Sequence, residues 1–385
     1  MTKNTADANP AGGVRCLALS VDIGAGHRRA AEALCEAILR LRPGSQDHIV
    51  EALPYLGPGA EKLAKDLYFG VLKDAPDLWG MFYKQRTLVD VFRPFSEFLD
   101  DLRTHKLAPV IKSFQPDVIF AMHPIACGLA GALSRGGRAD CPVVAVLTDF
   151  DGHPAWIAKG IDLYLAPIPQ VARDLERQGL PTGTVAVTGI PLRAGFENIR
   201  NVKTACSSLG LNNGLFTILL LGGGLGLGPI LETIEALATL EGPIQLALIA
   251  GNNRELAQSA RILVNRCSIP LHVRGLVENI WEYLRAADVV ISKPGGLTCA
   301  EVLAVGVPFI ALAPIPGQEQ ANCDALVQAG VALHAPSAQA ACTAVKRLLR
   351  SPQLRHEMSQ AALQLGCPTA ARKAAQEVLA LIEKH

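Results

Sequence analysis

The sequence FTILLLGGGLGLGPILETIEAL, residues 216–237, joins an unbroken apolar run to a glycine-rich turn and then to apolar residues at helical spacing. A continuous apolar run indicates a parallel strand covered on both faces, and alternation of such strands with helices is typical of doubly wound α/β sheets. The same order of strand, glycine turn and helix begins earlier, in RCLALSVDIGAGHRRAAEAL at residues 15–34. The chain therefore predicts two Rossmann-like α/β domains that face a cleft.

Further apolar runs of this kind are predicted as strands, each followed by a helical pattern. In the first half they are Arg15–Val21, Val118–Met122, Val143–Thr148, Leu163–Ala166 and Val185–Thr188. In the second half they are Phe216–Leu221, Ile244–Ala250, Leu271–Val273, Val289–Ser292 and Phe309–Leu312. In the first helix Ala30, Leu34, Ala37, Ile38 and Leu41 form the apolar face, and Pro43-Gly44 ends it.

The length of 385 residues exceeds what one ordinary core supports. We divide the chain into a polar N-terminal tail (1–13), a first α/β domain (14–200), a turn-rich linker (201–213), a second α/β domain (214–365) and a C-terminal helix (366–385). For this last helix, packing back on the first domain is one possible arrangement.

Composition excludes several classes of protein. The formal net charge is +1 and no basic stripe is present, which argues against a nucleic-acid partner. The ten cysteines form no CxxC pair, so we expect reduced thiols and no metal site. The N-terminus has no apolar segment typical of a signal peptide, and the uncharged stretch 204–231 is interrupted by glycine and asparagine. A cytoplasmic protein without a membrane span is predicted.

The second glycine turn, GGGLGLGP at residues 222–229, is a candidate phosphate site. Its bare backbone lets an anion approach, and the following helix offers unpaired N–H groups and partial positive charge. Gly223, Gly224 and Gly226 are the candidate contacts. A tight turn with close helix packing is the alternative.

A second helix start lies in SKPGGLTCAEVL, residues 292–303. Gly295, Gly296 and Thr298 stand at the predicted N-terminus and suit a diphosphate. Glu301 lies about one turn further, where a carboxylate can accept hydrogen bonds from a ribose diol. The alternative for Glu301 is a carboxylate that interacts only with the helix dipole.

The loop PIPGQEQ, residues 314–320, follows the predicted strand Phe309–Leu312. Gln318 and Glu319 are expected to project from this loop, and amide and carboxylate groups pair well with sugar hydroxyls. Ordinary solvation of a loop is the alternative.

The segment LTDFDGHPAWI, residues 147–157, contains the pair Asp149 and Asp151. The spacing superficially matches a metal-binding DxD motif, but here the pair follows a buried parallel strand, where helix ends can neutralise a diphosphate instead. We expect His153, Pro154 and Trp156 to line the cleft. A capped structural loop is the alternative.

Aromatic residues concentrate between Tyr68 and Phe98, which hold eight of the 19 in the chain. Several lie beside lysine or arginine, as in an interfacial membrane contact. A pair of core helices would give the same pattern, and the sequence leaves the two interpretations open.

Taken together and in this order, these motifs resemble the family of monogalactosyldiacylglycerol synthases and processive diacylglycerol glucosyltransferases. This group is a branch of glycosyltransferase family 28, which also holds the peptidoglycan lipid-intermediate N-acetylglucosaminyltransferase. The motifs that carry the resemblance are GAGHRRAAEAL, LTDFDGHPAWIAKGIDLYLAP, VTGIPLRAGF, GGGLGLGPILETIEAL and SKPGGLTCAEVLAVGVPFIAL followed by PIPGQEQAN.

The resemblance implies a GT-B fold, inversion at the sugar, no essential metal and no cofactor. A UDP-hexose donor would bind the second domain and a diacylglycerol acceptor the first. The implied peripheral contact with anionic lipid places the protein on the inner face of the cell membrane. KPGGLT is closer to the bacterial glucosyltransferases and GAGHRRAAEAL to the plant galactosyltransferases, so the sugar stays open, as does the oligomeric state.

The same resemblance assigns roles to individual residues. His27 matches the proposed catalytic histidine, and an imidazole with a pKa near 6.5 suits removal of a proton from an alcohol. Glu301 matches the ribose-binding glutamate. Gln318 and Glu319 match the pair that reads the hexose, with Asn322 at a frequently polar position near them. The remaining match is an acceptor-side loop, to which we assign Asp149, His153, Pro154 and Trp156.

Three other functions use related motifs. One is transfer of N-acetylglucosamine from its UDP donor to a polyprenyl-diphosphate lipid, and another is a UDP-N-acetylglucosamine 2-epimerase. A dinucleotide-dependent dehydrogenase is disfavoured because GAGH lacks the third glycine of that fingerprint. For His27, binding of backbone or phosphate is the alternative to a base.

Overall fold

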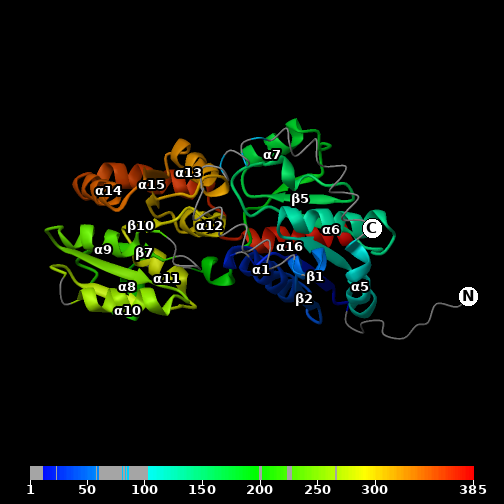
Figure 1. Cartoon of the computed structure of the whole chain (residues 1–385), viewed down its shortest axis with the longest axis horizontal. Coiled ribbons are helices and arrows are strands. Elements are labelled where there is room, and N and C mark those ends of the chain that lie inside the picture. The colour runs from blue at the N-terminus through cyan, green and yellow to red at the C-terminus, as the bar shows by residue number, and fades with distance from the viewer. Residues whose placement is uncertain are drawn as a thin grey trace, which may run out of the picture.

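The computed structural model describes residues 12–22, 24–57, 59, 80, 83, 85, 103–198, 202–222, 228–264 and 267–385. Its strands form two parallel six-stranded sheets, each with helices packed around it (Figure 1). We call the part built on the sheet β1–β6 the first lobe and the part built on the sheet β7–β12 the second lobe. The doubly wound α/β fold predicted from the sequence is confirmed.

The first lobe has the strand order β2-β1-β3-β4-β5-β6. The order reverses between β1 and β3, and ligands of such sheets bind outside the carboxyl ends of the strands at this reversal. The strands are β1 (Arg15–Ser20), β2 (Gln46–Glu51), β3 (Val118–Ala121), β4 (Val143–Val146), β5 (Leu163–Ala166) and β6 (Val185–Val187).

The second lobe has the strand order β12-β11-β10-β7-β8-β9, with its reversal between β7 and β10. The strands are β7 (Phe216–Leu221), β8 (Ile244–Ile249), β9 (Leu271–Arg274), β10 (Val289–Ser292), β11 (Phe309–Leu312) and β12 (Ala332–Ala335). The glycine turn after β7 and the SKPGG turn after β10 therefore follow the two strands at which ligands are expected.

The helices cover the faces of the sheets. Those before β7 are α1 (Ala25–Leu41), α5 (Ala108–Phe114), α6 (Pro124–Arg135), α7 (Pro169–Arg177) and α8 (Val202–Leu209). The later ones are α9 (Ile230–Ala238), α10 (Arg254–Leu263), α11 (Ile280–Ala286), α12 (Gly296–Val305), α13 (Gln318–Gln328), α14 (Ala338–Arg350), α15 (Pro352–Leu365) and α16 (Ala370–Ile382). Short 3₁₀ turns are η1 (Leu53–Leu56), η2 (Thr104–Lys106), η3 (Pro154–Trp156) and η4 (Ala194–Phe196).

All ten predicted strands are present, but β2 and β12 were not predicted. Both are edge strands, paired on one side only. β2 reads QDHIVE, and its first three residues are exposed, so it lacks the apolar run that marks the central strands. The predicted face of α1 is also correct in Ala30, Leu34, Ala37 and Ile38, whereas Leu41 is exposed.

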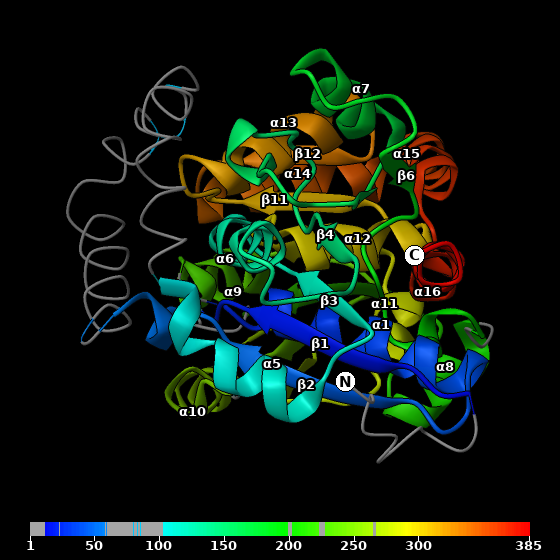
Figure 2. The ribbon, with the colours of Figure 1, turned by 90° about the vertical axis from the view of Figure 1, so that its right-hand side faces the viewer.

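The C-terminal helix α16 packs against α1 of the first lobe, although it follows the second lobe in the chain. Figures 1 and 2 both show α16, in red, alongside the blue α1. Arg42, just after α1, forms an ion pair with Glu383, just after α16. The chain thus crosses back from the second lobe to the first, and the hydrophobic core of the first lobe continues beneath α12 into the second.

Candidate active site

Two helix N-termini meet where the lobes face each other. Helix α1 begins after Gly24 and helix α12 after Gly295, and neither start has a side-chain cap among the described residues. A Cβ added at Gly26 would lie 3.6 Å from the Cβ of Leu297, so the first turns of the two helices are in contact range. Because uncapped N-termini present unpaired N–H groups and partial positive charge, this junction favours an anion.

The two glycines at the start of α12 have different surroundings. A Cβ added at Gly296 would overlap the carbonyl oxygen of Thr148 in the first lobe, whereas one at Gly295 would meet nothing within 4 Å. Gly296 therefore serves the close approach of the lobes, and Gly295 is the one open toward the cleft. Thr298, the third residue of α12, is half-buried.

His27 is the third residue of α1 and is partly buried between strand ends of the first lobe. Its Nδ1 lies 2.8 Å from the Thr148 hydroxyl, and its ring meets that of His123 edge to face at 5.0 Å between centroids. Burial lowers the pKa of His27, and the charge of Asp149 is the main opposing influence, followed by the Met122 carbonyl and Asp22. The imidazole is therefore neutral at pH 7 and able to accept a proton.

Thr148 and His123 were not singled out from the sequence. His123 follows β3, which pairs with β1, and Thr148 follows β4, the next strand of the sheet. Because ligands of such sheets bind at the carboxyl ends of the strands, both positions could have been predicted. His123 also caps α6, because its Nδ1 accepts from the Ile125 amide at 3.2 Å, and burial and His27 hold its pKa well below the usual range. A neutral, cap-forming His123 packs beside His27 without competing as a charged group.

Asn322 joins the lobes. Its side-chain oxygen accepts from the Phe150 amide at 2.7 Å, and its nitrogen donates to the Pro294 carbonyl at 3.1 Å and to the Asp149 carboxylate at 3.2 Å. Asn322 is completely buried, so in this arrangement it holds the first-lobe loop that carries Asp149 against the second lobe. Burial raises the pKa of Asp149, while the neighbouring His27 lowers it.

Gln318 and Glu319 are the first two residues of helix α13, so the prediction of a loop position was wrong. The Glu319 carboxylate accepts from the Ile315 amide at 2.9 Å and lies 3.8 Å from the Lys293 ammonium. Burial raises the pKa of Glu319 and lowers that of Lys293, and in each the partner opposes the shift. Lys293 was missed by sequence reasoning, and its Cε would lie 3.3 Å from a Cβ on Gly228.

Glu301 lines a cleft between the lobes of about 310 Å³, open to solvent. Arg29 of α1 and Arg193 of the first lobe line the same cleft, with Val277 and Ile280 on the second lobe. Glu301 is 8% exposed, and burial raises its pKa to about 7, opposed by the charges of Arg29 and Arg193. This places a carboxylate, two guanidinium groups and apolar side chains around one space between the lobes.

The loop after Asp149 is more structural than expected. Trp156 is 1% exposed and packs in the core, so its predicted place along the cleft is wrong. His153 is buried, its Nδ1 accepts from the Ala155 amide at 3.2 Å, and its Nε2 lies 3.0 Å from the Tyr83 carbonyl. Pro154 begins the short turn η3 next to it. Both ring nitrogens of His153 are thus used to hold the loop and the Tyr83 backbone.

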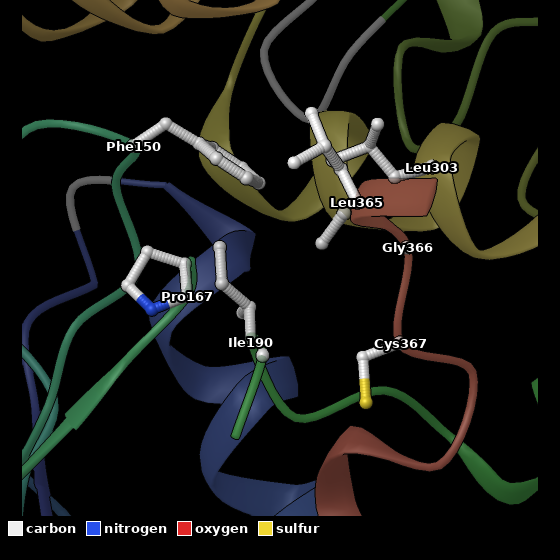
Figure 3. A pocket seen from close by; sticks show the side chains of 9 residues that line it. Phe150, Pro167, Ile190, Leu303, Leu365, Gly366 and Cys367 are labelled. Carbon is white, nitrogen blue, oxygen red and sulfur yellow. The ribbon is translucent and has the colours of Figure 1, made fainter. Parts of the chain in front are cut away.

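A small apolar hollow lies behind the site, where the lobes join (Figure 3). Phe150 and Ile190 enclose it from the first lobe, and Leu303 of α12 and Leu365 at the end of α15 enclose it from the other side. Its empty volume is about 220 Å³. The hollow sits beside the chain that leads into α16, because Gly366 and Cys367 also line it.

Several predicted features lie outside the described residues. These are Gly223, Gly224 and Gly226 of the second glycine turn, and the segment Tyr68–Phe98 apart from residues 80, 83 and 85. Within the described part of the chain, no three His, Cys, Asp or Glu side chains are grouped so that they could hold a metal ion. None of the described helices has the length and apolarity needed to cross a bilayer.

Comparison with known proteins finds two matching family models and several similar proteins. Residues 27–192 match the family model of monogalactosyldiacylglycerol (MGDG) synthase, and residues 230–365 match that of glycosyl transferases group 1. The chain is 29% identical over 349 residues to the processive diacylglycerol beta-glucosyltransferase of Bacillus subtilis (strain 168), with 90% of each chain covered. The chain is thus similar, over most of its length, to processive diacylglycerol glucosyltransferases and monogalactosyldiacylglycerol synthases, and residues 27–192 match the model of the latter family.

Both branches of this family are represented among its relatives. The chain is 29% identical over 383 residues to monogalactosyldiacylglycerol synthase 1, chloroplastic, of Arabidopsis thaliana, covering 96% of the chain and 71% of that protein. Among solved structures, MurG of Acinetobacter baumannii aligns with a TM-score of 0.61 and 18% identity, over 97% of this chain and 100% of that one. This likeness shows the GT-B fold, which confirms the architecture expected for the family.

Proposed function

We propose that the chain transfers a hexose, galactose or glucose, from a UDP-sugar to the hydroxyl of diacylglycerol, with inversion at the anomeric carbon. The relatives named above are diacylglycerol glucosyltransferases and monogalactosyldiacylglycerol synthases, which supports the reaction class. The observation that carries the proposal is the position of His27. A neutral imidazole of one lobe stands beside an uncapped helix N-terminus of the other.

In the proposed mechanism His27 acts as the general base. The acceptor hydroxyl oxygen attacks the anomeric carbon while its proton passes to the unprotonated ring nitrogen of His27, and the bond from the anomeric carbon to the diphosphate oxygen breaks. Asp149 lies in the same buried region and favours the imidazolium that forms, because its charge raises the pKa of His27. A single displacement of this kind inverts the configuration at the sugar.

The leaving UDP gains negative charge as the bond breaks. Two groups that follow strand β10 are available to stabilise this charge. They are the Lys293 ammonium and the unpaired N–H groups at the start of α12. Preorganised dipoles of this kind can take the place of a divalent metal, so we propose a reaction without metal or cofactor. Glu301 would accept hydrogen bonds from the ribose, and Gln318 and Glu319 at the start of α13 would contact the hexose.

Diacylglycerol resides in a bilayer, so the enzyme must work at a membrane surface. We propose a peripheral association with the inner face of the cell membrane through anionic lipid. The aromatic segment Tyr68–Phe98 is the candidate for this contact, on the strength of its sequence alone.

The direct test is transfer of label to lipid. Purified protein is incubated with liposomes containing diacylglycerol and either UDP-[14C]galactose or UDP-[14C]glucose. We expect label in the lipid phase from one donor or both. Absence of lipid-soluble label from both, or transfer only to a polyprenyl-diphosphate acceptor, would contradict the proposal, and turnover of UDP-N-acetylglucosamine that ignores liposomes would point to an epimerase instead.

The pH dependence follows from the pKa of His27. The general base must be neutral, and because burial lowers its pKa below 6.5 it stays neutral throughout the range above that value. We therefore expect kcat to be flat near pH 7 and to fall only on acidification below about 6.5. A profile of kcat against pH, measured under donor saturation, tests this. A kcat that already falls on acidification from well above pH 7 would argue against His27 as the base.

A further inference from the structure

Neighbouring arginines on α1 have different surroundings. Arg28 is exposed and pairs with Asp22 at 3.4 Å and with Glu32 at 3.3 Å. Arg29 is half-buried and lines the cleft with Glu301, and no described residue gives it a hydrogen bond or an ion pair. A guanidinium held toward a cleft without a partner has all five of its donors available to a ligand.

The group opposite Arg29 is also without a hydrogen-bond partner. Glu301 is 8% exposed, and no donor among the described residues reaches its carboxylate. A buried polar group without a partner is costly, which indicates that a ligand supplies the missing bonds. Arg193, the other cation in the cleft, already pairs with Glu278 at 2.8 Å. Arg29 is therefore the cation of this cleft that is free for a ligand within the described structure.

We propose that the nucleotide of the donor is held from both lobes, with Arg29 of the first lobe binding the phosphate next to the ribose while Glu301 of the second lobe binds the ribose diol. This rests on the proposed function, because it takes a UDP-sugar as the ligand. Arg29 and Glu301 each lie about one turn inside helices whose N-termini face each other. A ribose-phosphate between them satisfies the carboxylate with hydroxyl donors and the guanidinium with phosphate oxygens.

Donor binding then depends on the contact between the lobes that Gly296 and Asn322 make in this structure. Since one contact comes from each lobe, the nucleotide binds best when the lobes are closed, and closure is also what brings His27 to the donor. The acceptor-side lobe would thus recognise the donor directly, before any lipid is bound.

The experiment compares Arg29→Ala with Arg28→Ala, a matched control one residue away that faces Asp22 and Glu32. Calorimetry measures binding of UDP and UMP, and ligand-observed NMR measures binding of uridine, all without lipid and at pH 8. We expect Arg29→Ala to raise the Kd for UDP and for UMP by about 10- to 100-fold, the range of one charge-assisted hydrogen bond. The Kd for uridine should stay within about 3-fold of the wild-type value. Arg28→Ala should bind all three like the wild type.

A second variant guards against loss of folding. Arg29→Lys keeps a positive charge and should recover a large part of the UDP affinity, with thermal unfolding temperatures recorded for each protein. Unchanged UDP binding in Arg29→Ala, or an equal loss for uridine, overturns the inference. A wild-type protein that binds no UDP would instead overturn the proposed function, so the two failures are distinguishable.

The pH dependence of uridine binding gives an independent check. Uridine carries no phosphate, so ionisation of a phosphate does not affect its binding. Its affinity therefore reports the ionisation of Glu301, because the carboxylate form accepts hydrogen bonds from the ribose diol. Arg29 and Arg193 are the charges that face Glu301, and its pKa is about 7. Affinity should therefore fall as pH drops through about 7 in the wild type, and in Arg29→Ala the fall should begin at higher pH, because a charge that lowers this pKa is gone. An unshifted profile contradicts the placement of the Arg29 charge near the Glu301 carboxylate.

Discussion

Replacing His27 with alanine is expected to reduce kcat by about 10²- to 10⁴-fold, the usual contribution of a positioned general base. His27 stands at the start of α1, where its Nδ1 lies 2.8 Å from the Thr148 hydroxyl and burial lowers its pKa. The base is therefore neutral and oriented before the acceptor arrives. Single-turnover kinetics with diacylglycerol liposomes would measure the loss.

Donor affinity should separate the two interpretations of His27. If it is the base, Kd for UDP measured by calorimetry stays within a few-fold of the wild-type value in His27→Ala, because the nucleotide contacts come from α12 and the Glu301 cleft. If Kd rises in parallel with the loss of turnover, His27 is a phosphate ligand. Thr148→Val offers a milder variant, which keeps the size of the side chain and removes only the hydroxyl next to Nδ1.

Replacing Gly296 with alanine is expected to separate the lobes and to reduce kcat by about 10²-fold, since misplacement of reacting groups by about 1 Å can cost that much. A methyl group at this position would overlap the Thr148 carbonyl oxygen, a backbone atom that cannot rotate away. The overlap is relieved only by moving α12 away from the first lobe, which also moves the helix N-terminus from His27.

The neighbouring Gly295 gives the matched control for this structural effect. It has φ of −66°, and a methyl group added there would meet no atom within 4 Å, so Gly295→Ala should leave the separation of the lobes unchanged. Small-angle X-ray scattering with saturating UDP measures the radius of gyration of both variants. An unchanged radius in Gly296→Ala, together with normal turnover, would show that the contact with Thr148 is not needed.

Much of the fold could be predicted because its strands are buried on both faces. β7 and β8 lie in the middle of their sheet and read as unbroken apolar runs, so they stand out without any knowledge of tertiary structure. β2 and β12 lie at sheet edges, and their sequences mix polar and apolar residues because part of each strand is exposed to solvent. Position at an edge is not sufficient to hide a strand, because the edge strands β6 and β9 were predicted from their sequences.

Parts of the candidate site could be predicted where a single short motif identifies the residue, as with His27 after its glycine turn and Glu301 on α12. Residues defined by contacts across the chain were harder to find. The role of Asn322 depends on Phe150, which is 172 positions away, and the position of Thr148 matters because Gly296 packs on it. Trp156 shows the opposite error: an aromatic residue in a promising motif can serve the core.

In the proposed mechanism a nucleotide sugar binds the second lobe, against α12, and His27 of the first lobe lies across the cleft from it. A crystal structure of the wild-type protein with UDP tests this most directly. We expect the ribose at Glu301, the diphosphate at the start of α12 beside Gly295, and the His27 ring facing the terminal phosphate. Uridine bound on the first lobe, or a His27 side chain turned away from the diphosphate, would contradict it.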